Sequence, residues 1–185
     1  MLDVEEYLSL AVNASQKQDH QTALECLSKV IELEPDNPLA LYLRAAEHAE
    51  LGLLQRAIDG MESALQIKSD LILARLQLAM LYMQSGNNEN ALFHFSLVLT
   101  SDATEEIKLY AQGLQTHIEG DIESSLDLLS KGVDAPQQFS ELRNVIAAFI
   151  ESEKLKTHDL QDSEDQNITE DTPVFLGAYR SSGDD

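Results

Sequence analysis

The histidines of this chain are its most versatile side chains, since an imidazole can bind a metal, carry a proton or donate to a ligand. They are His20, His48, His94, His117 and His158. No two of them lie four residues apart, which is the spacing that places two metal ligands on one face of a helix. We therefore expect no metal site, and we expect no other cofactor.

Groups that could serve catalysis are also scarce. Cys26 is the only cysteine, so no intrachain disulfide can form, and its predicted role is that of a small, partly buried side chain. The acidic pairs Glu5-Glu6 and Glu105-Glu106 are adjacent on predicted helices and point to different sides. The sequence contains no Gly-rich phosphate loop and no Gly-x-Ser-x-Gly motif. We predict that the protein is not an enzyme.

The formal net charge is −21, from 33 acidic and 12 basic residues. This charge argues against nucleic acid and anionic membranes as partners, because both require clustered lysine and arginine. It leaves room for a basic protein partner, and the alternative is that the charge serves solubility alone. There is no apolar run of about 18 residues, and the acidic N-terminus is unlike a secretory signal, so we expect a cytoplasmic protein.

The elements that carry these residues repeat every 34 residues. One residue of each repeat stands where a turn is expected, and these are Gln18, Gly52, Gly86 and Gly120. A small residue precedes each of these turns at the same step, at Ala11, Ala45, Ala79 and Gly113. A fixed period of this length indicates a solenoid in which each helical unit packs on its neighbours.

Apolar periodicity predicts about nine helices. The first five cover about 4–17, 20–33, 38–51, 54–68 and 71–85, and the sixth ends near residue 100. The seventh covers about 103–119, the eighth follows a turn at Gly120-Asp121 and ends near 131, and the ninth covers about 138–156. Asp19 and Asn37 are predicted N-caps, and Pro38 suits the first position of a helix. Asp70 is expected to open the fifth helix, and Asp102 to form a capping box with Glu105.

The third repeat reads Leu78-Ala79-x-x-Tyr82, Gly86 and Ala91-x-x-x-Phe95, while the first has Tyr7-x-x-Leu10-Ala11, Ala23-x-x-x-Leu27 and Pro35. This pattern resembles the tetratricopeptide repeat family. The resemblance implies an all-α, right-handed superhelical solenoid of antiparallel helix pairs. Four repeats would cover 4–37, 38–71, 72–105 and 106–139, and a capping helix over 138–156 would complete a solenoid domain of residues 1–156.

In this family the first helix of each pair lines the concave groove, which is where a ligand would bind. Counting from the small residue of each first helix assigns twelve residues to a partner-binding groove: Leu8, Val12, Leu39, Tyr42, Leu73, Leu76, Met80, Met83, Ile107, Tyr110, Leu114 and His117. The set is almost wholly apolar and lacks the lysines and arginines with which some family members hold a terminal carboxylate. We predict an adaptor or chaperone that binds a hydrophobic helix or extended peptide of another protein.

Other interpretations of the groove stay open. The same residues would also be explained by ordinary packing between repeats or by a homodimer interface. The protein would then be a self-assembling structural or scaffold protein, or a regulatory subunit of a larger complex.

Residues 157–185 are acidic and polar, and we predict that this tail is disordered. An apolar island at 173–179 interrupts it, with Val174, Phe175, Leu176 and Tyr179 as its large side chains. One hypothesis is that the island docks in the groove as a tethered ligand, and the alternative is an incidental sticky stretch in a loose terminus.

Overall fold

The computed structural model describes residues 2–136 and 139–162 of the chain. Within these residues it contains nine α-helices and no strand, which confirms the predicted all-α fold. The chain divides into two compact units, one up to His94 and the other from Phe95 onward. The predicted tail ligand at 173–179 lies outside the described residues.

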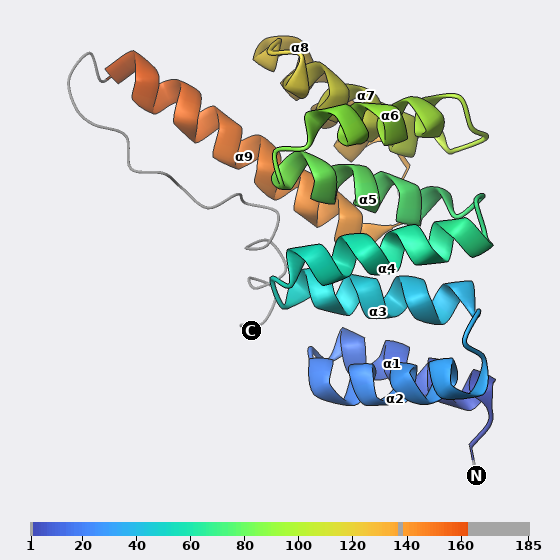
Figure 1. The fold of residues 1–185 in the computed structure, drawn as a ribbon. Helices are drawn as coiled ribbons and strands as arrows, with labels where there is room; N and C mark the ends of the chain where they lie inside the picture. Colours follow the sequence, from blue (N-terminus) through green and yellow to red (C-terminus); the bar gives the residue numbers. More distant parts are fainter. Residues whose placement is uncertain (1, 137–138, 163–185) are drawn as a thin grey trace. The chain divides into compact units, whose positions relative to one another are not determined.

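The first unit is built from antiparallel helix pairs joined by short turns (Figure 1). Its complete helices are α1 (Val4–Gln16), α2 (His20–Leu33), α3 (Pro38–Glu50), α4 (Leu54–Ile67) and α5 (Ile72–Gln84). Helix α1 packs on α2 and α3 packs on α4, and each second helix also packs on the first helix of the following pair. The boundary between the units falls inside α6 (Asn88–Leu99).

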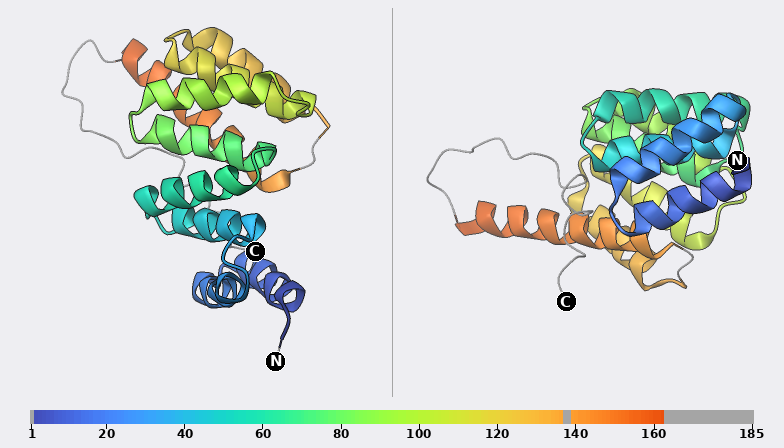
Figure 2. Two further views of the ribbon diagram at one scale, coloured as in Figure 1. Left: turned by 45° about the vertical axis from the view of Figure 1, so that its right-hand side comes forward. Right: turned by 90° about the horizontal axis from the view of Figure 1, so that it is seen from below.

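The second unit contains the end of α6 and a further pair of helices. This pair is α7 (Glu105–Ile118) and α8 (Ile122–Asp134), and the long helix α9 (Ser140–Asp162) packs on α8. Figure 2 shows α9 as one continuous helix. Helix α9 is the last helix of the described residues, and its range overlaps the predicted capping helix over 138–156.

The four turn residues that stand 34 apart share one backbone conformation. Gln18 has φ 58°, and Gly52, Gly86 and Gly120 have φ between 73° and 92°. Glycine adopts this left-handed region without steric cost, whereas a residue with a Cβ is strained there. The period in the sequence is therefore a period of helix-ending turns, and the first repeat makes its turn with a glutamine.

Several predicted caps are present and others are not. Asp19 accepts from the Thr22 amide, and Asn37 accepts from the Ala40 amide with Pro38 at the first helical position. Neither Asp70 nor Asp102 acts as predicted, because α5 and α7 begin later in the chain, after Leu71 and Thr104, without a side-chain cap.

A capping box that the sequence reading missed lies at the start of α1. The Glu6 amide donates to Asp3 and the Asp3 amide donates to Glu6, both at 2.8 Å. Aspartate takes the place of the usual serine or threonine in this motif.

Small residues allow the helices of a pair to cross closely. A Cβ placed on Gly60 of α4 would lie 2.8 Å from the Cβ of Ala45 on α3, and one on Gly113 of α7 would lie 2.6 Å from Leu129 on α8. Ala45 and Gly113 belong to the set of small residues that repeats every 34 positions. The structure thus explains why those positions must be small.

Two helices end later than the sequence predicts. Helix α8 continues through Gly132 to Asp134, because this glycine packs against the ring of Tyr110 and does not terminate the helix. Helix α9 continues past Lys156 to Asp162, although its apolar face has ended and Leu155 is already exposed. A helix can outlast the face that it buries, so apolar periodicity underestimates its length.

Candidate interaction surface

Within the first unit, the first helices of successive pairs contact one another through polar side chains. Ser15 of α1 donates a hydrogen bond to Glu47 of α3, and the Gln77 side chain of α5 lies close enough to Tyr42 of α3 to influence its pKa. Helices α1, α3 and α5 therefore form one layer.

The contacts define which side of each first helix faces a neighbour. A helix turns by about 100° per residue, so positions three before and four after the small residue lie near each other, at about 50° from it. Ser15 stands four after the small residue of α1 and contacts Glu47, which stands two after the small residue of α3. Tyr42 stands three before the small residue of α3 and interacts with Gln77, which stands two before the small residue of α5. Side chains midway between the two contact sides, at about 100–140°, face neither neighbour.

We call the side chains midway between these contacts the first-helix surface. They stand six before, one after and five after each small residue, and in the first unit they are Glu5, Val12, Gln16, Leu39, Ala46, Glu50, Leu73, Met80 and Gln84. The row five after the small residue was missed by the sequence reading. The sequence could have indicated this row, since Gln16, Glu50 and Gln84 are polar residues spaced by the same 34 positions as the small residues.

The structure separates the predicted groove residues of the first unit by exposure. Val12 is 40% exposed and Leu39 is 45% exposed. Four others are half-buried, namely Leu8, Tyr42, Leu73 and Met83. Leu76 and Met80 are buried, which corrects their assignment to an open groove. Leu76 stands three before the small residue, the position at which Tyr42 and Leu8 pack on other helices.

In the second unit three of the four predicted groove residues are buried: Ile107, Tyr110 and Leu114. For Tyr110 the cause is visible, since its ring packs on Gly132 of α8. These three residues are therefore core, and the groove prediction is corrected for the fourth repeat.

His117, the fourth predicted groove residue of this unit, is half-buried and contacts α9. Its ring lies edge-on to Phe149 with a centroid distance of 5.0 Å, and its Nε2 is 3.9 Å from the Glu153 carboxylate. His117 and Phe149 lie three repeat lengths beyond Ser15 and Glu47. Helix α9 thus contacts α7 through repeat positions that correspond to those by which α3 contacts α1.

A buried polar cluster lies where α1, α2 and α3 meet. Glu47 of α3 is 3% exposed, and its carboxylate accepts from the Ser15 hydroxyl. Its other oxygen lies 2.8 Å from Nδ1 of His20, the first residue of α2. A buried carboxylate requires such partners, because an unpaired charge in the protein interior is costly.

Glu50 lies one helical turn beyond Glu47 and differs from it in having no partner. It is half-buried, and no described residue forms an ion pair or hydrogen bond with its carboxylate. Burial, together with the negative charge of Glu47, raises the pKa of Glu50 to about 8. At neutral pH this side chain is mostly protonated, which is unusual for a glutamate.

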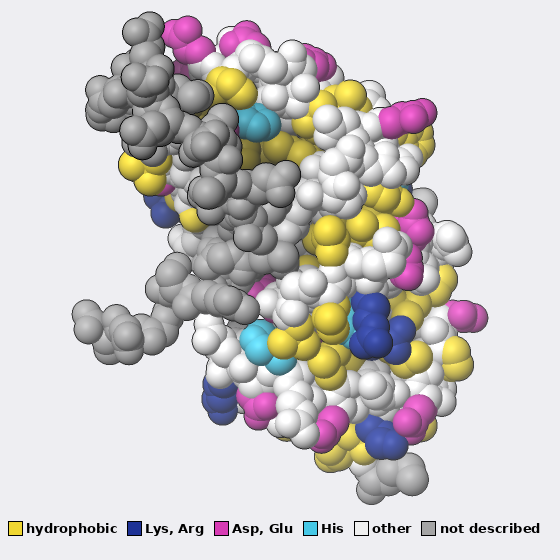
Figure 3. Space-filling view, turned by 60° about the vertical axis from the view of Figure 1, so that its left-hand side comes forward, with side chains coloured by type: hydrophobic (Ala, Val, Ile, Leu, Met, Phe, Trp, Pro, Cys, Tyr) yellow, Lys and Arg dark blue, Asp and Glu magenta, His cyan; other side chains and the backbone are white. Residues whose placement is uncertain are grey.

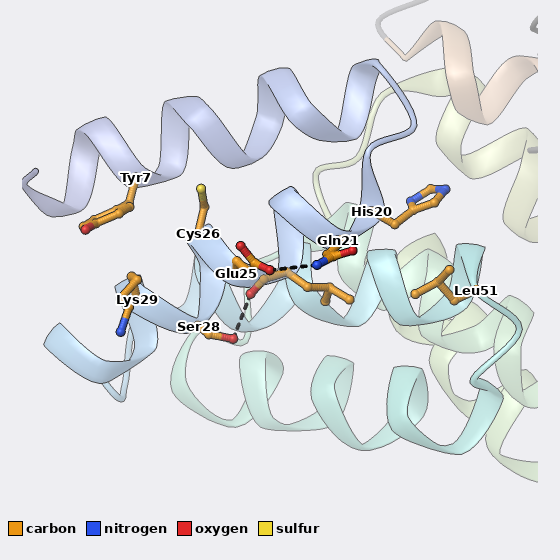
Figure 4. A pocket seen from close by; sticks show the side chains of 9 residues that line it. Tyr7, His20, Gln21, Glu25, Cys26, Ser28, Lys29 and Leu51 are labelled. Atoms are coloured by element: carbon orange, nitrogen blue, oxygen red, sulfur yellow. Dashed lines mark hydrogen bonds between the residues drawn. The ribbon is translucent and has the colours of Figure 1, made fainter.

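A shallow pocket of about 800 Å³ lies along α2 (Figure 4). It is lined mainly by α2, together with Tyr7 of α1 and Leu51 at the end of α3. Gln21 and Glu25 are hydrogen-bonded to each other at 3.1 Å within it. Burial raises the pKa of the Cys26 thiol, which disfavours the reactive thiolate. The Cys26 thiol in this pocket is therefore not an activated nucleophile.

Two general findings bear on the type of site. Among residues 2–136 and 139–157, no group of three or more histidine, cysteine, aspartate or glutamate side chains is placed to hold a metal ion. No helix in that part of the chain is long and apolar enough to cross a membrane.

Comparison with known proteins agrees with the architecture. The family model of the tetratricopeptide repeat matches residues 7–37 and 73–105. These segments correspond to the first and third helix pairs of the structure. These two segments are therefore tetratricopeptide repeats, and repeats of this family typically act as modules for binding other proteins.

Among curated proteins, DnaJ homolog subfamily C member 3 of Homo sapiens is 26% identical over 160 residues, which is 78% of this chain and 32% of that protein. Anaphase-promoting complex subunit 3 of Schizosaccharomyces pombe is 23% identical over 136 residues, 74% of this chain and 20% of that protein. The chain thus spans a third or less of the length of these two relatives.

Among solved structures, MamA of Desulfovibrio magneticus RS-1 is similar with a TM-score of 0.60 and 18% sequence identity. The similarity covers 88% of this chain and 97% of that one. At this level of identity it establishes a shared fold.

Proposed function

We propose that this protein is a non-enzymatic, cytoplasmic adaptor or chaperone that binds an apolar helix of another protein on the first-helix surface. The observation that carries the proposal is the exposure of Val12 and Leu39, which stand on neighbouring first helices at positions that face neither neighbour. Leu73 of α5 holds the same repeat position as Leu39 of α3 and extends the same surface. Val12 stands one after its small residue and lies on the same side of its own helix, so one partner can cover these three apolar side chains.

The energetic argument is one of apolar burial. A large aliphatic side chain that passes from water to a packed environment contributes about 1.5–3 kcal/mol. Val12 and Leu39 are each nearly half exposed, so a partner that covers both gains a useful part of this energy. Figure 3 shows hydrophobic side chains grouped beside polar ones on one face of the molecule. Amphipathic helices bind such surfaces through residues spaced three and four apart.

The test uses the full chain and a synthetic peptide of leucine, alanine and glutamine, about 18 residues long, which is about five helical turns. Fluorescence anisotropy measures its dissociation constant. The double variant Val12→Gln with Leu39→Gln should weaken binding about tenfold or more, because two apolar contacts are lost. The control is Leu33→Gln, which changes a side chain that is 50% exposed at the end of α2.

Equal affinities of the double variant and the control would contradict the proposal. Light scattering over a range of protein concentrations tests the alternative function. Self-association that the double variant abolishes, in a chain that binds no peptide, would favour the self-assembling protein instead.

A further inference from the structure

We propose that the helix bound by the first-helix surface carries a lysine or arginine, and that Glu50 receives this side chain. The inference rests on the proposed function and names the chemistry of its partner. Glu50 belongs to the same surface as Leu39, on the same helix α3. Leu39 and Glu50 lie on one side of α3, eleven residues and about 16 Å apart along the helix, so a partner helix that lies along α3 would reach both side chains.

The first argument is the contrast between two neighbouring glutamates. Glu47 is buried and its carboxylate is satisfied by Ser15 and His20. Glu50 is half-buried, and no described residue satisfies it. A partly buried carboxyl group without a partner is destabilising, and a cation supplied from outside would relieve this cost.

The second argument is charge complementarity over the whole surface. Of its nine residues in the first unit, Glu5 and Glu50 are acidic and none is lysine or arginine. The chain as a whole carries a net charge of −21. An apolar helix with a basic residue matches this surface, whereas an acidic helix would be repelled.

The charged groups around Glu50 are few. Glu47, on the same helix, is the described side chain whose charge acts on Glu50, and His20 of α2 is bonded to that carboxylate. From α1 the uncharged Ser15 hydroxyl is bonded to the same Glu47 carboxylate. Arg56 of α4 acts on His48 on another side of α3. No described basic group therefore competes with an incoming lysine.

Binding of a cation should be coupled to release of a proton. Because burial and Glu47 raise the pKa of Glu50 to about 8, the free protein holds a proton there at neutral pH. An ammonium group beside the carboxylate favours its ionised form and lowers this pKa. Peptide binding at pH 7 should therefore release protons, and the preference for lysine should grow as pH rises towards about 9.

The experiment compares three peptides on the intact chain: the neutral peptide described above, and two versions in which one central glutamine is replaced by lysine or by glutamate. We expect the lysine peptide to bind about tenfold more tightly than the neutral one, since hydrogen bonds to charged groups contribute about 1.5–3 kcal/mol. The glutamate peptide should bind most weakly. Calorimetry in two buffers of different ionisation enthalpy measures the released proton.

Matched variants separate a local effect from the general charge of the chain. Glu50→Gln should abolish both the preference for lysine and the proton release. Glu123→Gln removes the same charge at an exposed position on α8 and should retain both. An equal preference for lysine in the two variants would overturn the proposal, and so would unchanged proton release in Glu50→Gln.

Failure of this inference can be told apart from failure of the proposed function. If the neutral peptide binds and its binding depends on Val12 and Leu39, but lysine brings no gain, then only the role of Glu50 is wrong. If no peptide binds, both are wrong. The proton measurement on the unmodified chain gives an answer even if a variant folds poorly.

Discussion

Substitution of Gly132 by alanine tests directly whether Tyr110 is core or groove. A Cβ on Gly132 would lie 2.7 Å and 2.8 Å from two ring carbons of Tyr110 and 3.2 Å from the Cβ of Leu109. Atoms in van der Waals contact are at least about 3.5 Å apart, so one of the groups must move. The ring cannot swing into solvent without opening the core, because Tyr110 is fully buried.

Two effects of opposite sign determine the magnitude. Alanine is a better helix former than glycine by up to about 1 kcal/mol, which would stabilise α8. Forcing an extra methyl group into a packed core costs about 1–3 kcal/mol. We therefore expect Gly132→Ala to lower the free energy of unfolding by about 1–2 kcal/mol.

The assay is urea unfolding followed by far-ultraviolet circular dichroism. A second measurement places the same substitution in a Tyr110→Leu background, in which the ring is absent. There Gly132→Ala should be neutral or slightly stabilising, giving a coupling energy of about 1–3 kcal/mol between the two sites. If Gly132→Ala stabilises the unmodified chain, the close packing of Tyr110 on α8 is refuted and the groove assignment of Tyr110 regains support.

Three further outcomes follow from the polar groups. Glu47→Ala should destabilise the chain by about 2–4 kcal/mol in urea unfolding, because it removes the acceptor of two buried bonds, while Lys131→Ala at an exposed ion pair should cost under about 1 kcal/mol. Burial lowers the pKa of His117 below its ordinary 6.5 against the opposing effect of a nearby carboxylate, so the unfolded chain binds the proton more readily. Stability should therefore fall as pH drops below about 6.5, and His117→Phe should flatten this dependence when unfolding is measured between pH 5 and 7. Burial raises the pKa values of Tyr42 and Tyr82 to about 12, so an ultraviolet titration should show at least two of the five tyrosines ionising well above pH 10, and ionisation of all five together near pH 10 would contradict their burial.

The fold could be predicted because its signals are local and repeated. The turn residues must adopt a left-handed conformation, and Gly52, Gly86 and Gly120 mark three of the four turns directly. Asn37 and Pro38 could be placed at the start of a helix because the first amides of a helix lack intrahelical acceptors. This requirement involves only a few neighbouring residues. Asp70 and Asp102 have the same residue type as Asp19 but do not cap a helix. Residue type permits a cap, and the path of the chain decides whether it forms.

The candidate site was only partly predictable because exposure depends on neighbours that are distant in sequence. Val12 and Met80 hold equivalent repeat positions and are both apolar, yet Val12 is exposed and Met80 is buried. Periodicity alone cannot distinguish them, since it gives the side of a helix and not what lies against that side. Glu50 could not be singled out from the sequence, because what distinguishes it is that no described residue forms an ion pair or hydrogen bond with its carboxylate.

The sequence by itself therefore determined the helix pairs, their 34-residue step and the need for small residues at the crossings. Each of these follows from helix geometry and from steric limits that act within a short stretch of chain. Only the tertiary structure decided which apolar residues are core and which remain open, and that Glu47 has hydrogen-bond partners whereas Glu50 has none among the described residues. Burial and the partnering of charges are properties of the assembled helices, because they depend on which surfaces meet across many residues of chain.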